Sequence, residues 1–493
     1  MAHTMTRPIV CYSISLFLGC FASFLFIDNV YLGAVFSAFF LGLMYFTYDK
    51  KFFVFIFLFF LFGVLDFYGY YSFSISSKNI TIRVTQHNER YTNGVYKNYN
   101  ISLKGNVKNL KAGEKIYAYG YFTKKNDYGY GTIGCYHIES SKKFKDDLLF
   151  KIYEIKRNIY SKFKNDYGEE NTAEIMGLCF GDTDYLSDDE KSELKQLGVI
   201  HAISVSGFHI CIVYKIISIF LNVNISLILT FIYVIFTGAS SPSLRAFIMT
   251  AVMELSKKVH RNYDSLSSLS FSAIVLMLWR PYYVFDIGFD LSYLATLGII
   301  LFRKKLKKIF YYVPEKINNS LSTTLSAQVF SLPFASMCFK NISLGFVFGN
   351  LILGPLYSII VVLGNIALIS VKLSFIYVFV KYIICSVMAS INGAVFLLLK
   401  ISPPILNISV FDGIVLFSMA MSIIFYKHNM KKSFFIPLIL ATFILFENYY
   451  FFPEIKFIDA GKNYCTEIRY RNNSILVSEN PRQNLIKKLN KTY

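Results

Sequence analysis

Three long apolar runs open the chain, at residues 9–27, 30–48 and 52–71. Each approaches the ~20 apolar residues that cross the hydrocarbon core of a bilayer. The first run is longer than a signal-peptide core, and no small-residue cleavage site follows it, so we expect a retained anchor. Residues 1–71 therefore predict N-terminal transmembrane helices. We expect Arg7 and the basic turn at Lys50 and Lys51 to lie in the cytoplasm.

An alternating pattern replaces the apolar runs over residues 72–145. Apolar and polar residues alternate at 80–85 and 116–122, and further strand-like pieces lie at 95–103 and 132–139, separated by turns with Gly or Asn. A period of two is typical of half-buried strands. About four or five short strands in this length favour a small barrel or sandwich, with an OB-fold preferred. We expect an extracytoplasmic OB-like β domain here.

Residues 146–200 have the pattern of amphipathic helices in the membrane interface rather than of spanning helices. Apolar residues recur there at helical spacing among Lys and Glu: Leu148, Leu149, Ile152, Ile155 and Ile159. Ser187, with Glu190 three residues later, predicts a capping box at a helix start.

Residues 201–452 are apolar again and form the expected multi-helix channel domain. We expect about eight to ten further segments, and about 11 to 13 in the whole chain. Basic clusters at 257–261, 303–308 and 427–432 are placed inside the cell. The tail, 453–493, then lies outside, with two short strands expected. The fold class is a mainly α, multi-pass protein of the cytoplasmic membrane with an extracytoplasmic small β-barrel.

Composition supports a membrane protein and excludes two other classes. The chain has 493 residues, of which 54% are hydrophobic and only 16% are charged. An ordinary soluble enzyme is less apolar and more charged, and a disordered chain is far less apolar. The net charge of +19 points to anionic partners, namely lipid headgroups or nucleic acid. The positively charged cytoplasmic loops of any polytopic protein would also produce a positive net charge.

One stretch within the apolar region is rich in polar residues: His201, Ser204, Ser206, Gly207 and His209. Polar groups at membrane depth usually face a bundle interior or a water-filled path. Gly207 permits a broken helix whose free amides face a polar solute. Close helix packing through Ser and Gly is the alternative. Zinc is not expected, because no third ligand lies at suitable spacing.

Later apolar segments carry four more candidates for a polar path: Arg245, Asp290, Ser292 and Gln328. The planar guanidinium of Arg245 suits phosphate, and snorkelling to headgroups is the alternative. A carboxylate such as Asp290 needs a partner within an apolar segment. We expect that partner to be Arg245.

The predicted barrel is basic and rich in tyrosine. Between Lys78 and Lys143 it has twelve Lys or Arg and four Asp or Glu, a net charge of +8. Five of its residues form a candidate nucleic-acid surface: Tyr117, Tyr119, Tyr121, Lys124 and Lys125. A basic groove with aromatic faces is the usual way to bind single strands without sequence preference. A solvated basic face, with tyrosines resting on the membrane, is the alternative.

The order of the polar motifs resembles the competence domain of the ComEC family of DNA-uptake channels. The matching stretches are 201–209, Gly238 to Ala246, Gly288 to Tyr293 and Ala327 to Pro333, with Leu178 to Asp182 and Leu197-Gly198 upstream. The resemblance implies transport of one DNA strand across the cytoplasmic membrane during natural transformation. It departs from the family at Asp290, where Gln is common.

The tail resembles the start of the metallo-β-lactamase-like domain that ends many family members. Residues 457–469 resemble its first strand and 474–478 its second. The seven His are scattered and form no H-x-H-x-D-H motif, so a two-metal hydrolytic site cannot be assembled. We expect no catalytic residue, metal or cofactor, and a separate protein as nuclease.

The expected partners follow from the same hypothesis of DNA transport. We expect single-stranded DNA, membrane lipids, an extracellular DNA receptor and a cytoplasmic ATP-driven translocase, because the chain has no G-x-x-x-x-G-K-[ST] loop. A secondary transporter or channel for a smaller anionic solute is the alternative function, which repeat symmetry would favour. An enzyme of envelope assembly is a third alternative.

A disulfide between Cys135 and Cys179 would join the barrel to the interfacial helices. Two free thiols are the alternative, since they are as common.

Overall fold

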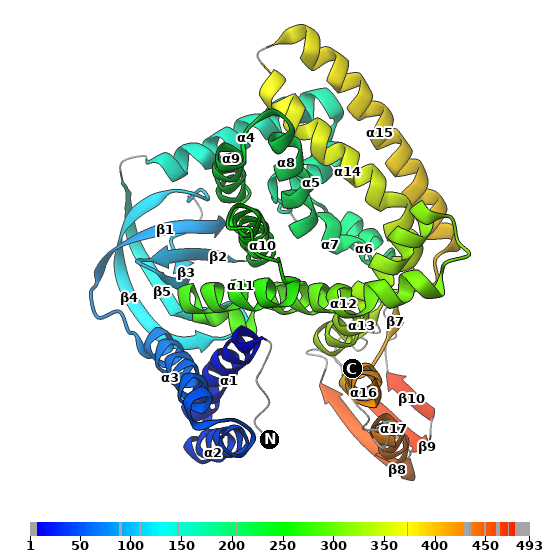
Figure 1. Ribbon diagram of the computed structural model, residues 1–493. Coiled ribbons are helices and arrows are strands. Elements are labelled where there is room, and N and C mark those ends of the chain that lie inside the picture. The colour runs from blue at the N-terminus through cyan, green and yellow to red at the C-terminus, as the bar shows by residue number, and fades with distance from the viewer. Residues whose placement is uncertain are drawn as a thin grey trace.

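The computed structural model describes residues 7–87, 91–107, 110–144, 147–203, 206–371, 373–427, 433, 435–447, 450–459, 464–471 and 473–478. It confirms a mainly helical membrane protein with one closed barrel (Figure 1). Ser204 lies outside the described residues.

The chain begins with three apolar helices, α1 (Pro8–Asp28), α2 (Val30–Thr47) and α3 (Lys50–Ser72), each long and apolar enough to cross a membrane. Helices α1 and α3 cross at Gly19 and Gly63, where a Cβ on either glycine would collide with a backbone carbonyl of the other helix. Small residues at a crossing allow close backbone approach in membranes.

The barrel consists of β1 (Asn79–His87), β2 (Thr92–Tyr96), β3 (Tyr99–Gly105), β4 (Lys115–Asp127) and β5 (Thr132–Lys143). Its strand order is β1-β2-β3-β5-β4 with closure, and only the β3–β5 pairing is parallel. Alternate residues point inward and form a core that includes Ile82, Ile101, Ile116, Ile133 and Tyr136. The barrel fits the predicted OB-fold.

The prediction of one strand over residues 95–103 is wrong, because the chain turns back within it. Tyr96 pairs with Tyr99 across a two-residue turn, and Lys97 at its first position has a φ of 54°. Tight hairpins need such left-handed backbone. Lys is not a typical residue at this turn position, so the sequence pattern did not indicate a turn.

Four helices follow the barrel: α4 (Leu148–Tyr167), α5 (Glu169–Phe180), α6 (Asp188–Gln196) and the short α7 (Ile200–Ile203). The capping box of Ser187 and Glu190 at the start of α6 is confirmed. One face of α4 is buried against protein, where Lys156 donates to the carbonyl of Phe180 at 3.0 Å. This contact joins α4 to the end of α5.

The rest of the chain is mostly helical. Its elements are α8 (Gly207–Phe220), α9 (Val223–Phe236), α10 (Ser241–Lys258), α11 (Ser265–Trp279), the 3-10 helix η1 (Pro281–Phe285), α12 (Ile287–Ile309), α13 (Glu315–Phe339), β6 (Asn341–Ile342), α14 (Phe346–Ser370), α15 (Ser374–Ile401), β7 (Leu406–Asn407), α16 (Val410–Lys427) and α17 (Phe435–Glu447). Over the described ranges, five helices can span a membrane by length and composition: α1, α2, α3, α14 and α15. Four shorter apolar helices accompany them. The count of about 11 to 13 segments stays a prediction.

The last described residues form a three-stranded antiparallel sheet, and not the two strands expected. It contains β8 (Tyr450–Asp459), β9 (Tyr464–Arg471) and β10 (Asn473–Ser478), with β9 in the middle. The sequence of β9 is rich in charged and polar residues, so its apolar alternation is weak. Backbone pairing on both edges supports it instead.

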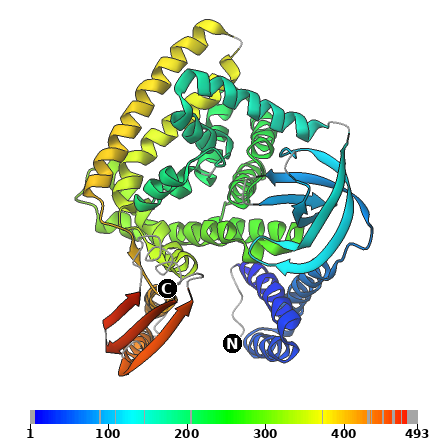
Figure 2. The ribbon, with the colours of Figure 1, turned by 180° about the vertical axis from the view of Figure 1, so that it is seen from behind.

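Two hydrophobic cores organise the molecule. One joins the barrel to α1, α3, α10, α11 and η1, and the other joins α4 and α5 to α14 and α15. In both views the N-terminal helices and the C-terminal elements α16, α17 and β8–β10 lie on the same side of α11 and α12 (Figures 1 and 2). The barrel packs directly against α10, α11 and η1.

Candidate nucleic-acid interface

Three exposed tyrosines form a stripe on the outer face of β4. Tyr117, Tyr119 and Tyr121 are 47%, 41% and 52% exposed, while Ile116, Ala118 and Gly120 between them point inward. On β5 the stripe faces Lys142, Ser140 and His137, and Tyr121 stacks on the His137 ring with centroids 4.7 Å apart. The structure thus brings together the tyrosines named from the sequence. Their role in binding stays a prediction.

The two lysines that follow the stripe have different surroundings. Lys125 is exposed. Lys124 donates from Nζ to the carbonyl oxygen of Tyr71 at 2.6 Å and to that of Phe73, so it holds the end of α3. Burial lowers the pKa of Lys124. The expectation that Lys124 serves the nucleic-acid surface is therefore not supported by its geometry.

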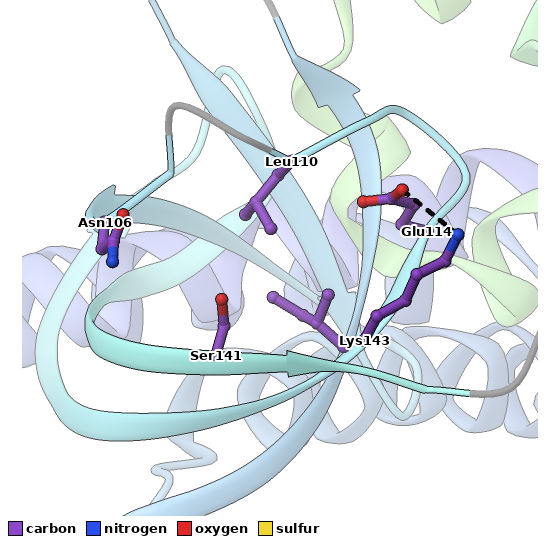
Figure 3. A pocket seen from close by; sticks show the side chains of 6 residues that line it. Asn106, Leu110, Glu114, Ser141 and Lys143 are labelled. Atoms are coloured by element: carbon purple, nitrogen blue, oxygen red, sulfur yellow. Dashed lines mark ion pairs between the residues drawn. The ribbon is translucent and has the colours of Figure 1, made fainter.

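A cavity of about 280 Å³ opens at one end of the barrel (Figure 3). Its lining comes from the loop after β3 and from the inner face of the β4–β5 ribbon: Asn106, Leu110, Glu114, Ile116, Ser141 and Lys143. Glu114 is nearly buried and pairs with Lys143 at 3.6 Å. Ile116 and Tyr117 are neighbours on opposite faces of β4, so the cavity and the tyrosine stripe occupy opposite faces of one ribbon.

The polar stretch at 201–209 becomes a break between two helices. His201 lies on α7, and α8 begins at Gly207 with Ser206 as its N-cap. His209 is buried, and its Nδ1 accepts from the backbone N–H of Ser206 at 3.3 Å. His209 therefore caps the helix start. This matches the broken helix expected from Gly207.

Arg245, on the second turn of α10, lies against the start of α8 and reaches the second and third turns of α12. Its Nη1 donates to the carbonyl oxygen of Ser292 at 2.5 Å and to the hydroxyl of Thr296, both on α12. A Cβ on Gly207 would lie 2.5 Å from Nη2 of Arg245, so only glycine leaves room for the guanidinium beside α8. Nε is buried without a hydrogen-bond partner.

The predicted ion pair between Arg245 and Asp290 is wrong. Within the described chain no ion pair joins them, because Arg245 instead contacts Ser292 and Thr296, further along α12. The carboxylate that links the starts of α10 and α12 is that of Asp286. It caps α12 by accepting from the N–H of Gly288 at 3.0 Å, and it accepts from the hydroxyl of Ser241 at 2.7 Å. Sequence reasoning missed Asp286 and Thr296.

Ser292 and Gln328 occupy different positions. Ser292 contributes its backbone carbonyl to Arg245. Gln328 lies on α13, where its Oε1 accepts from the hydroxyl of Ser331 on the same helix at 3.2 Å. The side-chain contacts described for Gln328 therefore tie it to its own helix. Its place in a polar path stays a prediction.

Neither a metal centre nor the expected disulfide forms in the described residues. No group of three or more His, Cys, Asp or Glu there could hold a metal ion. Cys135 and Cys179 are both free. Cys135 sits on β5 opposite Thr123, whereas Cys179 is buried in α5 and its thiol donates to the carbonyl of Ile360 at 3.5 Å. The disulfide prediction is wrong because the two thiols belong to different hydrophobic environments.

The helix starts of α8, α10 and α12 and the guanidinium of Arg245 together form an electropositive site. Helix N-termini carry partial positive charge and free N–H groups, and they commonly hold phosphate or carboxylate. Asp286 offsets part of this charge. In this arrangement Nη1 of Arg245 is held by Ser292 and Thr296, and Nη2 lies beside the start of α8.

Comparison with known proteins places this site within a family. A family model described as "Competence protein" matches residues 178–430, just over half of the chain. The chain belongs to the competence protein family. The ComEC-type assignment made from the motifs is confirmed. The matched range contains the broken helix, Arg245 and the whole of α12.

Two relatives are similar over parts of their length. "ComE operon protein 3" of Bacillus subtilis (strain 168) is 28% identical over 242 residues, which cover 47% of this chain and 31% of the relative. An "Uncharacterized protein" of Aquifex aeolicus (strain VF5) is 29% identical over 153 residues, or 30% of this chain and 37% of the relative. The matches thus span about a third of each relative. No solved structure matches the chain.

Proposed function

We propose that this competence protein carries single-stranded DNA across the cytoplasmic membrane during natural transformation. The observation that carries the proposal is the family match over residues 178–430, because that range contains Arg245 and its contacts with α8 and α12. A strand of phosphates crossing a medium of low dielectric constant needs compensating positive charge.

In this proposal the barrel receives the strand and the site at Arg245 conducts it. Tyr117, Tyr119 and Tyr121 stack on bases, and Lys125 contacts phosphate. Arg245 then holds one phosphate at a time through a charge-assisted contact. Conduction needs binding that is favourable but reversible. One Arg partly offset by Asp286 meets that requirement.

The proposed topology places the N-terminus in the cytoplasm, and the barrel and the C-terminal sheet outside. An extracellular receptor delivers DNA, and a cytoplasmic ATP-driven protein pulls it. The proposal assigns no covalent chemistry to this chain, on the sequence ground that no two-metal motif is present. A separate protein degrades the other strand.

The test compares Arg245→Ala with Asp290→Asn at matched abundance in the membrane. We expect Arg245→Ala to lower transformation about 100-fold, because a hydrogen bond to a charged group contributes up to ~3 kcal/mol. Asp290→Asn should have little effect, since Asp290 is not the partner of Arg245. Thr296→Val, which keeps the guanidinium and removes one acceptor, should give an intermediate loss. Transformation frequency and DNase-resistant labelled DNA are the measurements.

Two outcomes would contradict the proposal. Full activity of Arg245→Ala would remove this residue from the DNA path. Labelled DNA that still becomes DNase-resistant inside cells lacking the chain would exclude DNA transport altogether. Transport of a smaller anionic solute would then be the remaining hypothesis for the function of the region around Arg245.

A further inference from the structure

The turn between α12 and α13, residues 303–316, is strongly cationic. Five exposed cations occupy the last two turns of α12: Arg303, Lys304, Lys305, Lys307 and Lys308. Their opposite face, with Phe302 and Leu306, packs into a hydrophobic cluster with Phe330 of α13. The exposed face of the helix end is therefore mostly basic, with Ile309 as an exposed apolar residue at its tip. Lys316 adds another charge, and Glu315 is paired with Lys307 at 3.3 Å.

Two tyrosines project from the tip of the same turn. Tyr311 is 63% exposed and Tyr312 is 83% exposed, and their ring centroids lie 3.7 Å apart. Ile309, before them, is also exposed. Large rings in water are costly unless something covers them. In the sequence they lie between the five cations at the end of α12 and Lys316.

The order of residues argues against a simple contact with lipid headgroups. At a membrane boundary, aromatic residues sit at the interface between the apolar segment and the water, and Lys and Arg extend beyond them. Along α12 the order is reversed: the apolar segment is followed by the cations, and the tyrosines come last. A soluble anionic ligand with flat faces fits this order better, and single-stranded nucleic acid has both features.

The position of the turn agrees with this ligand. Helix α12 starts directly after η1, whose Tyr282 packs against Gly131 of the barrel. Ser292 and Thr296, in the first half of α12, contact Arg245. At 1.5 Å per residue its 23 residues extend about 35 Å. One helix thus connects the barrel joint, the Arg245 site and the basic turn.

We propose that the turn between α12 and α13 binds single-stranded nucleic acid, with phosphates on its cations and bases on Tyr311 and Tyr312. This rests on the proposed function and adds a second contact for the same strand, at the end of α12 far from the barrel. The binding is independent of sequence, because stacking and phosphate contacts do not read base edges.

The experiment uses the full chain in nanodiscs of zwitterionic phosphatidylcholine and an oligothymidylate carrying 4-thiothymidine. After irradiation, mass spectrometry measures crosslinks to the peptide with residues 303–316. We expect the double variant Tyr311→Ala with Tyr312→Ala to lower this crosslink yield at least about tenfold. Lys304→Gln with Lys308→Gln should lower the salt dependence by about 1.4 in log–log slope. Lys50→Gln with Lys51→Gln, a matched pair of exposed lysines, should change neither.

The overturning results are specific. No crosslink in 303–316 at low salt would remove the site. Unchanged crosslinking in both double variants, combined with lost binding to vesicles that contain anionic phosphatidylglycerol, would make the turn a lipid contact instead. Failure of the proposed function would give a different experimental result. Uptake that survives Arg245→Ala, with crosslinks to the turn intact, rejects the channel path and keeps the turn site.

Discussion

At the scale of single residues, Gly207 and Arg245 depend on each other. The guanidinium lies where a side chain at Gly207 would be, 2.5 Å from the position of its Cβ, and Ala246 lies 2.9 Å from the same position. A small first residue of α8 thus allows Arg245 to reach α12. Glycine is required at position 207 because α8 and α10 approach each other closely, and not because the backbone there is strained.

We therefore expect Gly207→Ala to be damaging although alanine is a good helix residue. Displacing Arg245 or Ala246 should lower the free energy of unfolding by about 1–3 kcal/mol and reduce transformation. Gly393→Ala, on α15 where a Cβ meets nothing within 4 Å, is the matched control and should change stability by less than about 1 kcal/mol. Thermal unfolding in detergent measures both. Equal effects of the two substitutions would contradict the close contact.

Asp286 and Asp290 show how a single residue was misjudged. Asp290 stood out in the sequence because it lies inside an apolar run, whereas no role was assigned to Asp286. Asp286 begins α12 as its N-cap, and this position lets it also reach Ser241 on α10. The spacing from Asp286 to Gly288 before an apolar run was the available signal, since Asp is a preferred N-cap.

At the scale of elements, strand β4 separates two roles. Tyr117, Tyr119, Tyr121 and Lys125 are odd-numbered and exposed, whereas Lys124 contacts the end of α3. Successive side chains of a strand point to opposite faces. The alternation of exposure ends after Tyr121, because Thr123, Lys124 and Lys125 are all exposed, so it is the hydrogen bonds of Lys124 to the end of α3 that separate it from the tyrosines.

This separation predicts different effects of neighbouring lysines on binding of an oligonucleotide by the full chain. Lys125→Ala should reduce the slope of log K against log salt by about 0.7, one phosphate contact. Tyr119→Ala should weaken binding about tenfold with the slope unchanged. Lys124→Ala should leave the slope unchanged and lower the thermal midpoint. Fluorescence anisotropy between 50 and 300 mM salt, as a rough range, measures these effects. A lower slope for Lys124→Ala than for Lys125→Ala would reverse the assignment.

At the scale of the whole molecule, the barrel is held at both of its ends. Tyr70, near the end of α3, donates to the carbonyl of Gly131 at 2.9 Å. At the other end Arg83 of β1 pairs with Asp147, the N-cap of α4, through both carboxylate oxygens. These two attachments restrict rotation of the barrel relative to α3 and α4.

The attachment through Asp147 predicts a dependence of stability on pH. Arg83 holds the pKa of Asp147 well below its ordinary value of about 3.9. A carboxyl with a lowered pKa stabilises the fold above its unfolded value, and this contribution is lost as the pH falls below about 4. Because Asp147 is about a third exposed, we expect at most about 1 kcal/mol.

The measurement compares thermal midpoints of the native chain and of Asp147→Asn, which keeps a capping side chain. Asp147→Asn should be less stable near pH 6, and the two midpoints should approach each other as the pH falls toward about 3. A difference that stays constant over this range would show that the ion pair contributes nothing.

The sequence by itself determined the class of this protein. Long apolar runs, a region of period two and polar motifs in a recognisable order predicted a multi-pass membrane protein with an OB-like barrel and membership of the competence family, and each is confirmed. These properties are local, because helix and strand periods and capping boxes depend on residues a few positions apart.

Only the tertiary structure decided which residues meet. Arg245 contacts α12 residues 47 and 51 positions away, Lys124 reaches α3 over 53 positions, and Cys179 donates to Ile360 over 181. Such pairings follow from how elements pack, and one sequence offers several equally charged candidates for each partner. That is why the pairing with Asp290 and the disulfide were wrong, and why the contacts of Lys124 were not foreseen.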